Sequence, residues 1–200
     1  MGDYILYQPL TRTDRMTVFL YRAGIALTCL MLAALAAFGV LSPAVSAGRA
    51  SLYFDLFLAL LYFAAGLNVF FIHLYIGGFK RKLIGLYFIA LAALAVIFIK
   101  GDGDALSFIS VTPPASLLFL PLAGCIGFVA AKEAFCFRLA EGYLLAMAMP
   151  LYLVALSTGG LGRAGIESGL MFIAAFYVFF TFRKIFMPIH CDIGDKSSYR

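Results

Sequence analysis

The stretch KRKLIGLYFIALAALAVIFIK, residues 80–100, places an uncharged apolar run at 83–99 between three basic residues and a fourth. A transmembrane helix needs about 20 predominantly apolar residues, with a usual range of about 17 to 25. Basic residues commonly flank such a helix because they remain in water or among the lipid headgroups. The stretch therefore predicts a helix that crosses a bilayer, and it raises the question of how many more the chain contains.

The composition of the whole chain agrees with a membrane protein. Of its 200 residues 64% are apolar and only 12% are charged, and the mean hydropathy is +1.01. A water-soluble domain of this length needs a far larger polar surface, so the soluble globular class is excluded. The net charge of +5 does not indicate nucleic-acid binding, because the basic residues stand in ones to threes between long apolar runs.

The apolar runs predict the fold class, an all-α polytopic transmembrane bundle with six spans. The first four runs are long enough directly, whereas the last two reach the necessary length with their flanking residues. A cytoplasmic segment at 1–16 and a cytoplasmic tail at 188–200 flank the six-helix domain at 17–187. The runs are 17–41, 52–76, 83–99, 113–131, 143–156 and 166–182.

The basic residues predict the orientation, because Lys and Arg near helix ends are retained in the cytoplasm. Counted over alternate loops, twelve of them fall on one side and three on the other. We therefore expect both termini in the cytoplasm, which requires an even number of spans. The larger group is Arg12, Arg15, Arg22, Lys80, Arg81, Lys82, Lys132, Arg138, Arg183, Lys184, Lys196 and Arg200, and the smaller is Arg49, Lys100 and Arg163. Seven of these are predicted to set the topology and to contact lipid headgroups: Lys80, Arg81, Lys82, Lys132, Arg138, Arg183 and Lys184.

Small residues recur at helical spacing in two predicted spans. Ala123, Gly127 and Ala131 stand every four positions in the fourth span, and Ala33 and Ala37 do so in the first. Small side chains let helices approach closely in lipid, so these faces are expected to pack against other helices.

Two sets of polar side chains have expected places relative to the membrane. Asn68 is the one strongly polar side chain well inside a predicted span, and it is expected to hydrogen-bond a neighbouring helix. Four tyrosines fall near the predicted cytoplasmic boundary and are expected to form an interfacial belt. They are Tyr21, Tyr75, Tyr87 and Tyr143.

Candidate metal ligands gather on the predicted cytoplasmic side. His73 closes the second span, Glu133 and Cys136 share a helical face three residues apart, and His190 lies in the tail. Imidazole, thiolate and carboxylate are ligands for zinc, iron or copper, although the spacing matches no standard metal motif. A bis-His haem would have to use His73 and His190, the only two histidines. The sequence requires no cofactor, and contact with lipid, water or backbone is the alternative use of these side chains.

Three segments resemble a known family. HLYIGGFKRKL (73–83), KEAFCFRLAEG (132–142) and DIGDKS (192–197) are similar to segments of a family of bacterial integral membrane proteins classed as a domain of unknown function. The resemblance covers most of the chain and implies a polytopic protein of the bacterial cytoplasmic membrane. It implies no activity and no catalytic residue.

The sequence favours a non-enzymatic accessory, assembly or structural subunit, whose partners are the lipid bilayer and another membrane protein or a second copy of this chain. Scarce polar chemistry inside the spans and the small-residue faces support this interpretation. A metal, haem or quinone redox protein with a cytoplasmic-face site is the first alternative, and a small-solute transporter is the second.

Overall fold

The computed structural model describes residues 10–41, 47–74 and 77–193, and the side chains of Ala47, His190 and Cys191 lie outside that description. Every regular element in these ranges is a helix, and six helices are long and apolar enough to cross a membrane. The all-α six-span prediction is therefore confirmed. In chain order the elements are α1 (Arg12–Leu41), α2 (Ala47–Phe71), α3 (Gly77–Lys100), α4 (Ala105–Val111), η2 (Pro113–Phe119), α5 (Leu120–Phe137), α6 (Ala140–Ser157), α7 (Arg163–Ile185) and α8 (His190–Ile193).

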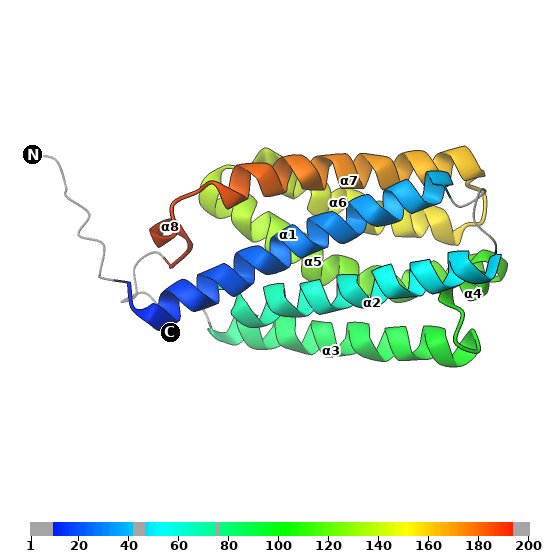
Figure 1. The fold of residues 1–200 in the computed structure, drawn as a ribbon, viewed down its shortest axis with the longest axis horizontal. Helices are drawn as coiled ribbons and strands as arrows, with labels where there is room; N and C mark the ends of the chain where they lie inside the picture. Colours follow the sequence, from blue (N-terminus) through cyan, green and yellow to red (C-terminus); the bar gives the residue numbers. More distant parts are fainter. Residues whose placement is uncertain (1–9, 42–46, 75–76, 194–200) are drawn as a thin grey trace, which may run out of the picture.

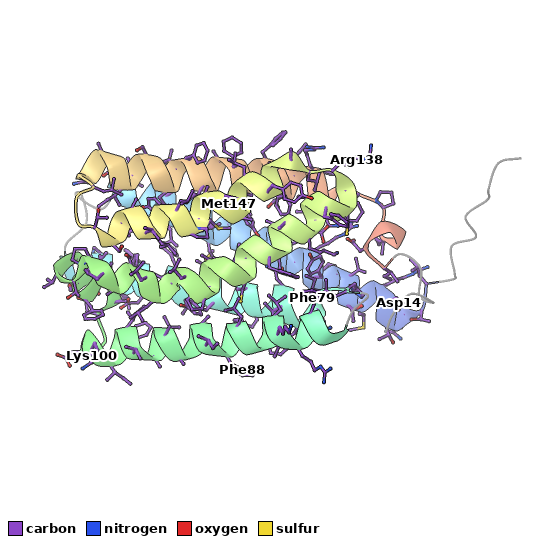
Figure 2. The ribbon with its side chains drawn as sticks, turned by 180° about the vertical axis from the view of Figure 1, so that it is seen from behind. Asp14, Phe79, Phe88, Lys100, Arg138 and Met147 are labelled. Carbon is purple, nitrogen blue, oxygen red and sulfur yellow. The ribbon has the colours of Figure 1, made fainter. Side chains whose placement is uncertain are left out.

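The long helices lie roughly side by side in one bundle, with α1 crossing between α2 and α7 (Figure 1). The start of α1, the end of α7 and the short α8 share one end of the bundle, which we call the α8 end. The opposite end, called here the α4 end, carries α4 and the chain from α6 to α7. Figure 2 shows the same division from behind, with Asp14 and Arg138 at the α8 end and Lys100 at the α4 end.

Helix boundaries differ from the predicted runs mainly at polar residues. Helix α3 begins at Gly77, so Lys80, Arg81 and Lys82 form its first turns rather than a loop before it. Helix α2 ends at Phe71, five residues before the predicted end of its run, so His73 lies in the connection that follows. Hydropathy alone cannot place these boundaries, because a helix continues into the headgroup region as long as its backbone bonds are made.

The fourth span begins with two prolines and changes its helical form on the way. Pro113–Phe119 is a 3₁₀ helix, and Leu120–Phe137 continues it as an α-helix. Proline lacks the N–H that a first helical turn leaves unpaired, so it is well tolerated there. Before this span, the Gly101–Asp104 turn leads into α4, which apolar periodicity did not predict. Asp104 begins α4 by accepting a hydrogen bond from the Ser107 N–H at 2.9 Å.

Polar bonds inside the membrane join α1 to α2. Asn68 donates to the Thr28 hydroxyl at 3.1 Å, and that hydroxyl donates to the Gly24 carbonyl at 2.9 Å. This is the interhelical bond expected of Asn68 from the sequence. Gly24 permits the close approach, since a Cβ at that position would collide with the Asn68 side chain and come within 3.0 Å of its backbone nitrogen.

Helices α5 and α6 form a close hairpin that turns at the α8 end. Arg138 adopts a left-handed conformation with φ of 55°, and α6 starts two residues later. A Cβ on Gly142 would collide with the Ala130 carbonyl oxygen and come within 2.9 Å of the Ala134 Cβ. Further along, a Cβ on Gly127 would lie 3.2 Å from the Ala146 Cα, which is close but short of a collision. The small-residue face predicted for the fourth span therefore includes a real close contact at Gly127.

Replacing Gly142 with alanine should destabilise the protein. Alanine is about 1 kcal/mol better than glycine in a helix interior, but the collision with a backbone carbonyl forces α5 and α6 apart, an overpacking cost of about 1–3 kcal/mol. Gly85→Ala in α3 is the matched control, because no atom lies within 4 Å of its added Cβ. Thermal unfolding in a mild detergent should show a lower Tm for Gly142→Ala only. An equal or higher Tm for Gly142→Ala would contradict the close contact.

Candidate functional site

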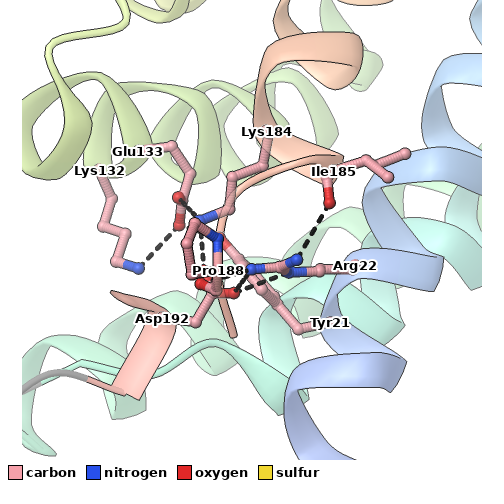
Figure 3. A network of polar contacts seen from close by, with 8 residues as sticks. All are labelled: Tyr21, Arg22, Lys132, Glu133, Lys184, Ile185, Pro188 and Asp192. Atoms are coloured by element: carbon pink, nitrogen blue, oxygen red, sulfur yellow. Dashed lines mark hydrogen bonds and ion pairs between the residues drawn. The ribbon is translucent and has the colours of Figure 1, made fainter. Parts of the chain in front are cut away.

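Five charged side chains meet inside the bundle near its α8 end, and we call them the ionic cluster. They come from four elements that are distant in the sequence: α1, α5, α7 and α8 (Figure 3). The members are Arg22, Lys132, Glu133, Lys184 and Asp192. The sequence places these residues on one side of the membrane and allows Glu133 to pair with Lys132 or with a neighbouring helix, but it does not identify the partner from that helix.

Glu133 stands at the centre of the ionic cluster and is fully buried. One of its oxygens, Oε1, accepts from the Tyr21 hydroxyl and from the Lys132 ammonium group, each at 2.7 Å. The other oxygen, Oε2, forms an ion pair with Lys184. Its carboxylate therefore receives donors from α1, α5 and α7 together. These donors offset the cost of burying a negative charge.

Lys184 is also fully buried, although it lies in the last turn of α7. Its ammonium nitrogen forms ion pairs with Glu133 and Asp192, so it joins α5 to α8. The same nitrogen lies 3.9 Å from the centre of the Phe137 ring, a favourable position for a cation–π interaction. The buried cation is thereby surrounded by two carboxylates and an aromatic face.

Arg22 completes the ionic cluster from α1. Its Nε donates to Asp192 Oδ2 at 2.7 Å, and Nη2 pairs with the same oxygen at 2.5 Å. Two more donors reach backbone carbonyls, that of Ile185 at 3.0 Å and that of Pro188 at 3.1 Å. One guanidinium thus fixes the end of α7, the connecting segment and α8 against α1, which uses the fork geometry particular to arginine.

The charges of the ionic cluster are nearly balanced, with three cations and two carboxylates. An ionised side chain at the centre of a membrane helix costs about 2.5–3.5 kcal/mol on insertion scales. Pairing within the protein offsets much of that cost, and such groups face the bundle interior when they occur in membrane spans. The arrangement therefore holds four elements together only as long as every member keeps its partner.

A second ion pair lies beside the ionic cluster. Arg183 Nη1 donates to both carboxylate oxygens of Glu141 at 2.9 Å, which ties α7 to the start of α6. Glu141 is buried, whereas the Arg183 side chain is 41% exposed. Neighbouring basic residues of α7 therefore have different uses. Lys184 points into the bundle, whereas Arg183 joins α7 to α6 at the bundle surface.

His73 contacts α1 at the same end of the bundle. Its Nε2 lies 3.1 Å from the Thr17 hydroxyl, and that hydroxyl donates its hydrogen to the Asp14 carbonyl at 3.0 Å. When the Thr17 hydrogen goes to the Asp14 carbonyl, Nε2 is the protonated nitrogen that donates to Thr17, and in the other tautomer Nε2 accepts from Thr17. Partial burial, followed by the positive charges of Lys132 and Lys80, lowers the pKa of His73 from its ordinary value of 6.5, against the smaller opposing effects of Asp192 and Asp14.

The predicted metal ligands occupy different environments. Glu133 is buried in the ionic cluster, Cys136 is exposed although it is only three residues away, and His73 bonds Thr17. Within the described ranges no three His, Cys, Asp or Glu side chains lie close enough to hold a metal ion. The side chain of His190 lies outside the described part, so a site that includes it stays a prediction. An absorption spectrum and elemental analysis of the purified protein test it directly.

The residues predicted to contact headgroups also divide into two groups. Arg81, Lys82 and Arg138 are exposed at the α8 end. Lys184, by contrast, lies within the protein, and the Lys132 side chain is only 12% exposed and paired with Glu133. Position along the sequence could not distinguish these groups, because both stand where a helix reaches the interface.

The prediction of an interfacial tyrosine belt is wrong for two of its four members. Tyr21 and Tyr87 are buried, and each uses its hydroxyl within the bundle, Tyr21 toward Glu133 and Tyr87 toward the Tyr62 carbonyl at 3.0 Å. Tyr143 is 48% exposed, and Tyr75 lies outside the described residues. The physical reason is that each hydroxyl has a hydrogen-bond acceptor inside the bundle, a carboxylate for Tyr21 and a backbone carbonyl for Tyr87, so neither needs the headgroup layer. Gly66 provides that close approach for Tyr87.

For two members of the ionic cluster, Arg22 and Asp192, the sequence contains a local indication of a buried ion pair. Arg22 stands inside the apolar run at 17–41, where a charge needs a countercharge. Asp192 stands in the tail, where an acidic residue can provide one. Only the position of α8 against α1 makes the pairing evident.

A cavity of about 620 Å³ lies in the other half of the bundle, toward the α4 end. We call it the outer pocket. Its inner end is formed by Leu61, Ile126 and Ile173, and its outer end includes Arg163 and Glu167. Nearly all of the remaining lining is aliphatic or aromatic, supplied by α1, α2, α4, η2 and α5–α7.

The size of the outer pocket is itself informative. Pockets for small organic ligands usually measure about 300–1,000 Å³. Water is a poor occupant, because it requires two to four polar partners and the lining offers few. The pocket is therefore suited to an apolar molecule.

The comparisons with known proteins concern the family alone. A family model described as "Uncharacterized integral membrane protein (DUF2301)" matches residues 67–200, from the end of α2 to the C-terminus. No curated protein and no solved structure matches the chain.

Lys184→Met should severely destabilise the bundle, because it leaves Glu133 and Asp192 facing each other across a buried site. Removing one partner of a buried ion pair costs about 3–5 kcal/mol. Lys100→Met is the control, since Lys100 is an exposed lysine at the opposite end. Chemical unfolding in detergent, followed by circular dichroism, measures the difference. Equal unfolding free energies for the two variants would refute the central role of Lys184.

His73 should make stability depend on pH. Because its pKa is lower in the folded protein than the ordinary 6.5, the unfolded chain binds a proton first as the pH falls below about 6.5. The free energy of unfolding should then decrease until the pH reaches the lower folded pKa, where it levels off. In His73→Gln, which keeps a neutral donor for Thr17, this part of the pH dependence should be absent. The same slope in both proteins between pH 7 and 5 would exclude His73 as its source.

Proposed function

Since the chain belongs to the DUF2301 family of integral membrane proteins, we propose that it acts as a non-enzymatic accessory or structural subunit that binds a transmembrane helix of another protein. We further propose a bacterial cytoplasmic membrane as its location, with both termini in the cytoplasm. Basic residues support this orientation, because in the described ranges they concentrate at the α8 end and leave Arg49, Lys100 and Arg163 at the α4 end.

The observation that carries the proposal is a groove between α1 and α7, which we call the α1–α7 groove. Its volume is about 440 Å³, and its lining is apolar throughout. Five alanines line it, with two valines, a leucine and a methionine: Ala33, Ala36, Ala37, Ala174, Ala175, Val40, Val178, Leu41 and Met171. Ala33 and Ala37 are the residues whose spacing suggested a packing face in the sequence.

Small side chains on a lipid-facing surface favour association with a helix. In a bilayer no hydrophobic effect brings helices together, so close van der Waals packing provides most of the attraction. Alanine permits that packing because the partner's backbone can approach closely, whereas a smooth surface of larger side chains packs equally well against lipid. Ala37 and Ala175 are exposed at the surface of the groove.

Polar contacts hold the two helices of the groove together at both ends. At the α8 end Arg22 of α1 donates to the Ile185 carbonyl of α7 at 3.0 Å. At the α4 end Arg163 of α7 donates to the Gly39 carbonyl of α1 at 3.3 Å. A surface fixed in this way loses little conformational entropy when a partner binds, which favours recognition by a preformed face.

The ionic cluster supports a structural rather than a catalytic use of the charged residues. Each of its members forms an ion pair with another member, and Glu133 accepts from Tyr21 as well. A general acid or base must instead reach a substrate atom with a group that can change its protonation state. The ionic cluster is better suited to fixing α8 and α1 than to exchanging protons with a substrate.

The partner can be tested with paired substitutions on the membrane surface. Ala37→Leu and Ala175→Leu fill the α1–α7 groove, and Ala95→Leu in α3 is the control at another exposed alanine. A photo-crosslinking amino acid at position 178, which also lines the groove and is exposed, should capture a second membrane protein in native membranes. We expect the two groove variants to reduce that adduct about tenfold and Ala95→Leu to leave it unchanged.

Two outcomes would contradict the proposal. One is an adduct of unchanged yield in all three variants, which would place the partner elsewhere. The other is cross-linking only between copies of this chain, which would replace the accessory role by self-association. Thermal unfolding of each purified variant verifies that the fold is retained.

A further inference from the structure

The outer pocket lies on the other side of α1 from the lipid-facing groove and has no part in the function proposed above. Residues of seven helical elements line it, so an occupant lies between helices of the bundle. The lining of the outer pocket differs between its two ends. The inner end is apolar, and the outer end contains the ion pair between Arg163 and Glu167 at 2.5 Å.

We propose that the outer pocket binds the hydrocarbon tail of a long-chain amphiphile with a phosphate or carboxylate head, and that Arg163 holds the head. The bilayer itself supplies phospholipids of this chemistry, and free fatty acids share it. The proposal concerns a binding site and involves no covalent step.

The length of the pocket matches a lipid tail. Along α7 its lining extends from Arg163 to Ile173, a distance of about 15 Å at 1.5 Å per helical residue. A bilayer's hydrocarbon core is about 30 Å thick, so one leaflet is about 15 Å. A tail in the pocket would therefore replace about one leaflet's depth of lipid contact and keep its head at the level of the headgroups.

The polar groups are at the correct end for an anionic head. Arg163 begins α7 at the α4 end, and its side chain is 58% exposed. Its described contacts use Nε for Glu167 and Nη2 for the Gly39 carbonyl, whereas a guanidinium has five N–H donors. The remaining donors can bind phosphate or carboxylate, for which the planar guanidinium is well suited.

The remaining polar lining argues against a compact polar solute. Ser110 donates to the Ser107 carbonyl within α4, and Tyr152 donates to the Ile166 carbonyl. Both donors are thus engaged by the protein's own backbone. A sugar or amino acid would bury its polar groups against an apolar surface, and that costs free energy without compensating bonds.

Because the sequence contains no tryptophan, a single one provides a specific fluorescent reporter. Phe119→Trp places it in the pocket lining, and Phe88→Trp places it on the lipid-facing side of α3 as the control. Both proteins are purified in dodecyl maltoside, an uncharged detergent. They are then titrated with a phosphatidylglycerol that carries brominated tails, with a brominated fatty acid or with a brominated alkane, since bromine quenches tryptophan fluorescence at contact.

We expect saturable quenching of Phe119→Trp by the phospholipid or by the fatty acid, reversed by the same lipid without bromine. The tighter of the two identifies the source of the tail. Quenching of Phe88→Trp should rise without saturation. Adding Arg163→Gln should weaken binding roughly tenfold, whereas Arg163→Lys should retain most of the affinity because the positive charge remains.

Filling the pocket tests the tail separately from the head. Ala123→Phe places a ring in the lining and should abolish the saturable quenching. If that variant does not fold, the surface substitution Arg163→Gln still decides the matter. Unsaturable quenching of Phe119→Trp, equal to that of Phe88→Trp, would overturn the site. Equal affinity for the brominated alkane, unaffected by Arg163→Gln, would overturn the role of the head.

Discussion

The ion pair between Glu133 and Lys184 is the interaction on which the α8 end of the bundle depends. Both side chains are fully buried, and neither charge could remain there alone, because lipid and protein interior solvate isolated ions poorly. Each consequently requires further partners: Tyr21 and Lys132 for the carboxylate, and Asp192 for the ammonium group. The need to neutralise one buried pair thus brings together parts of the chain that are up to 171 positions apart, from Tyr21 to Asp192.

This pairing has consequences beyond the ionic cluster itself. Arg22 donates to Asp192 and also to the Ile185 carbonyl at the end of α7. These bonds fix α1 and α7 to each other. At the opposite end Arg163 repeats the connection through Gly39. Between these two ties the α1–α7 groove faces lipid on one side, and the outer pocket lies within the bundle on the other. Both proposed binding surfaces therefore depend on helices whose ends are held by arginines.

Sequence patterns predicted the spans because the bilayer imposes a simple requirement on each of them. A helix that crosses hydrocarbon must be long, apolar and internally hydrogen-bonded, and six runs meet that description. The start of the fourth span at Pro113 was equally local and also agrees with the structure. The tyrosine belt failed at Tyr21 and Tyr87, because a tyrosine near an interface has two suitable environments and local sequence does not choose between them.

The sequence by itself determined the class of solvent, the number of membrane spans and the side on which the basic residues gather, since length, hydropathy and charge act locally. Only the tertiary structure decided that Lys184 and Lys132 pair with Glu133, that Arg22 binds Asp192, and that an apolar pocket remains between the helices at the α4 end. Those outcomes depend on helix rotation and on close approaches at glycines such as Gly24 and Gly142. A rotation of a fraction of a turn moves a charge from headgroup to interior, and no local pattern of residues specifies it.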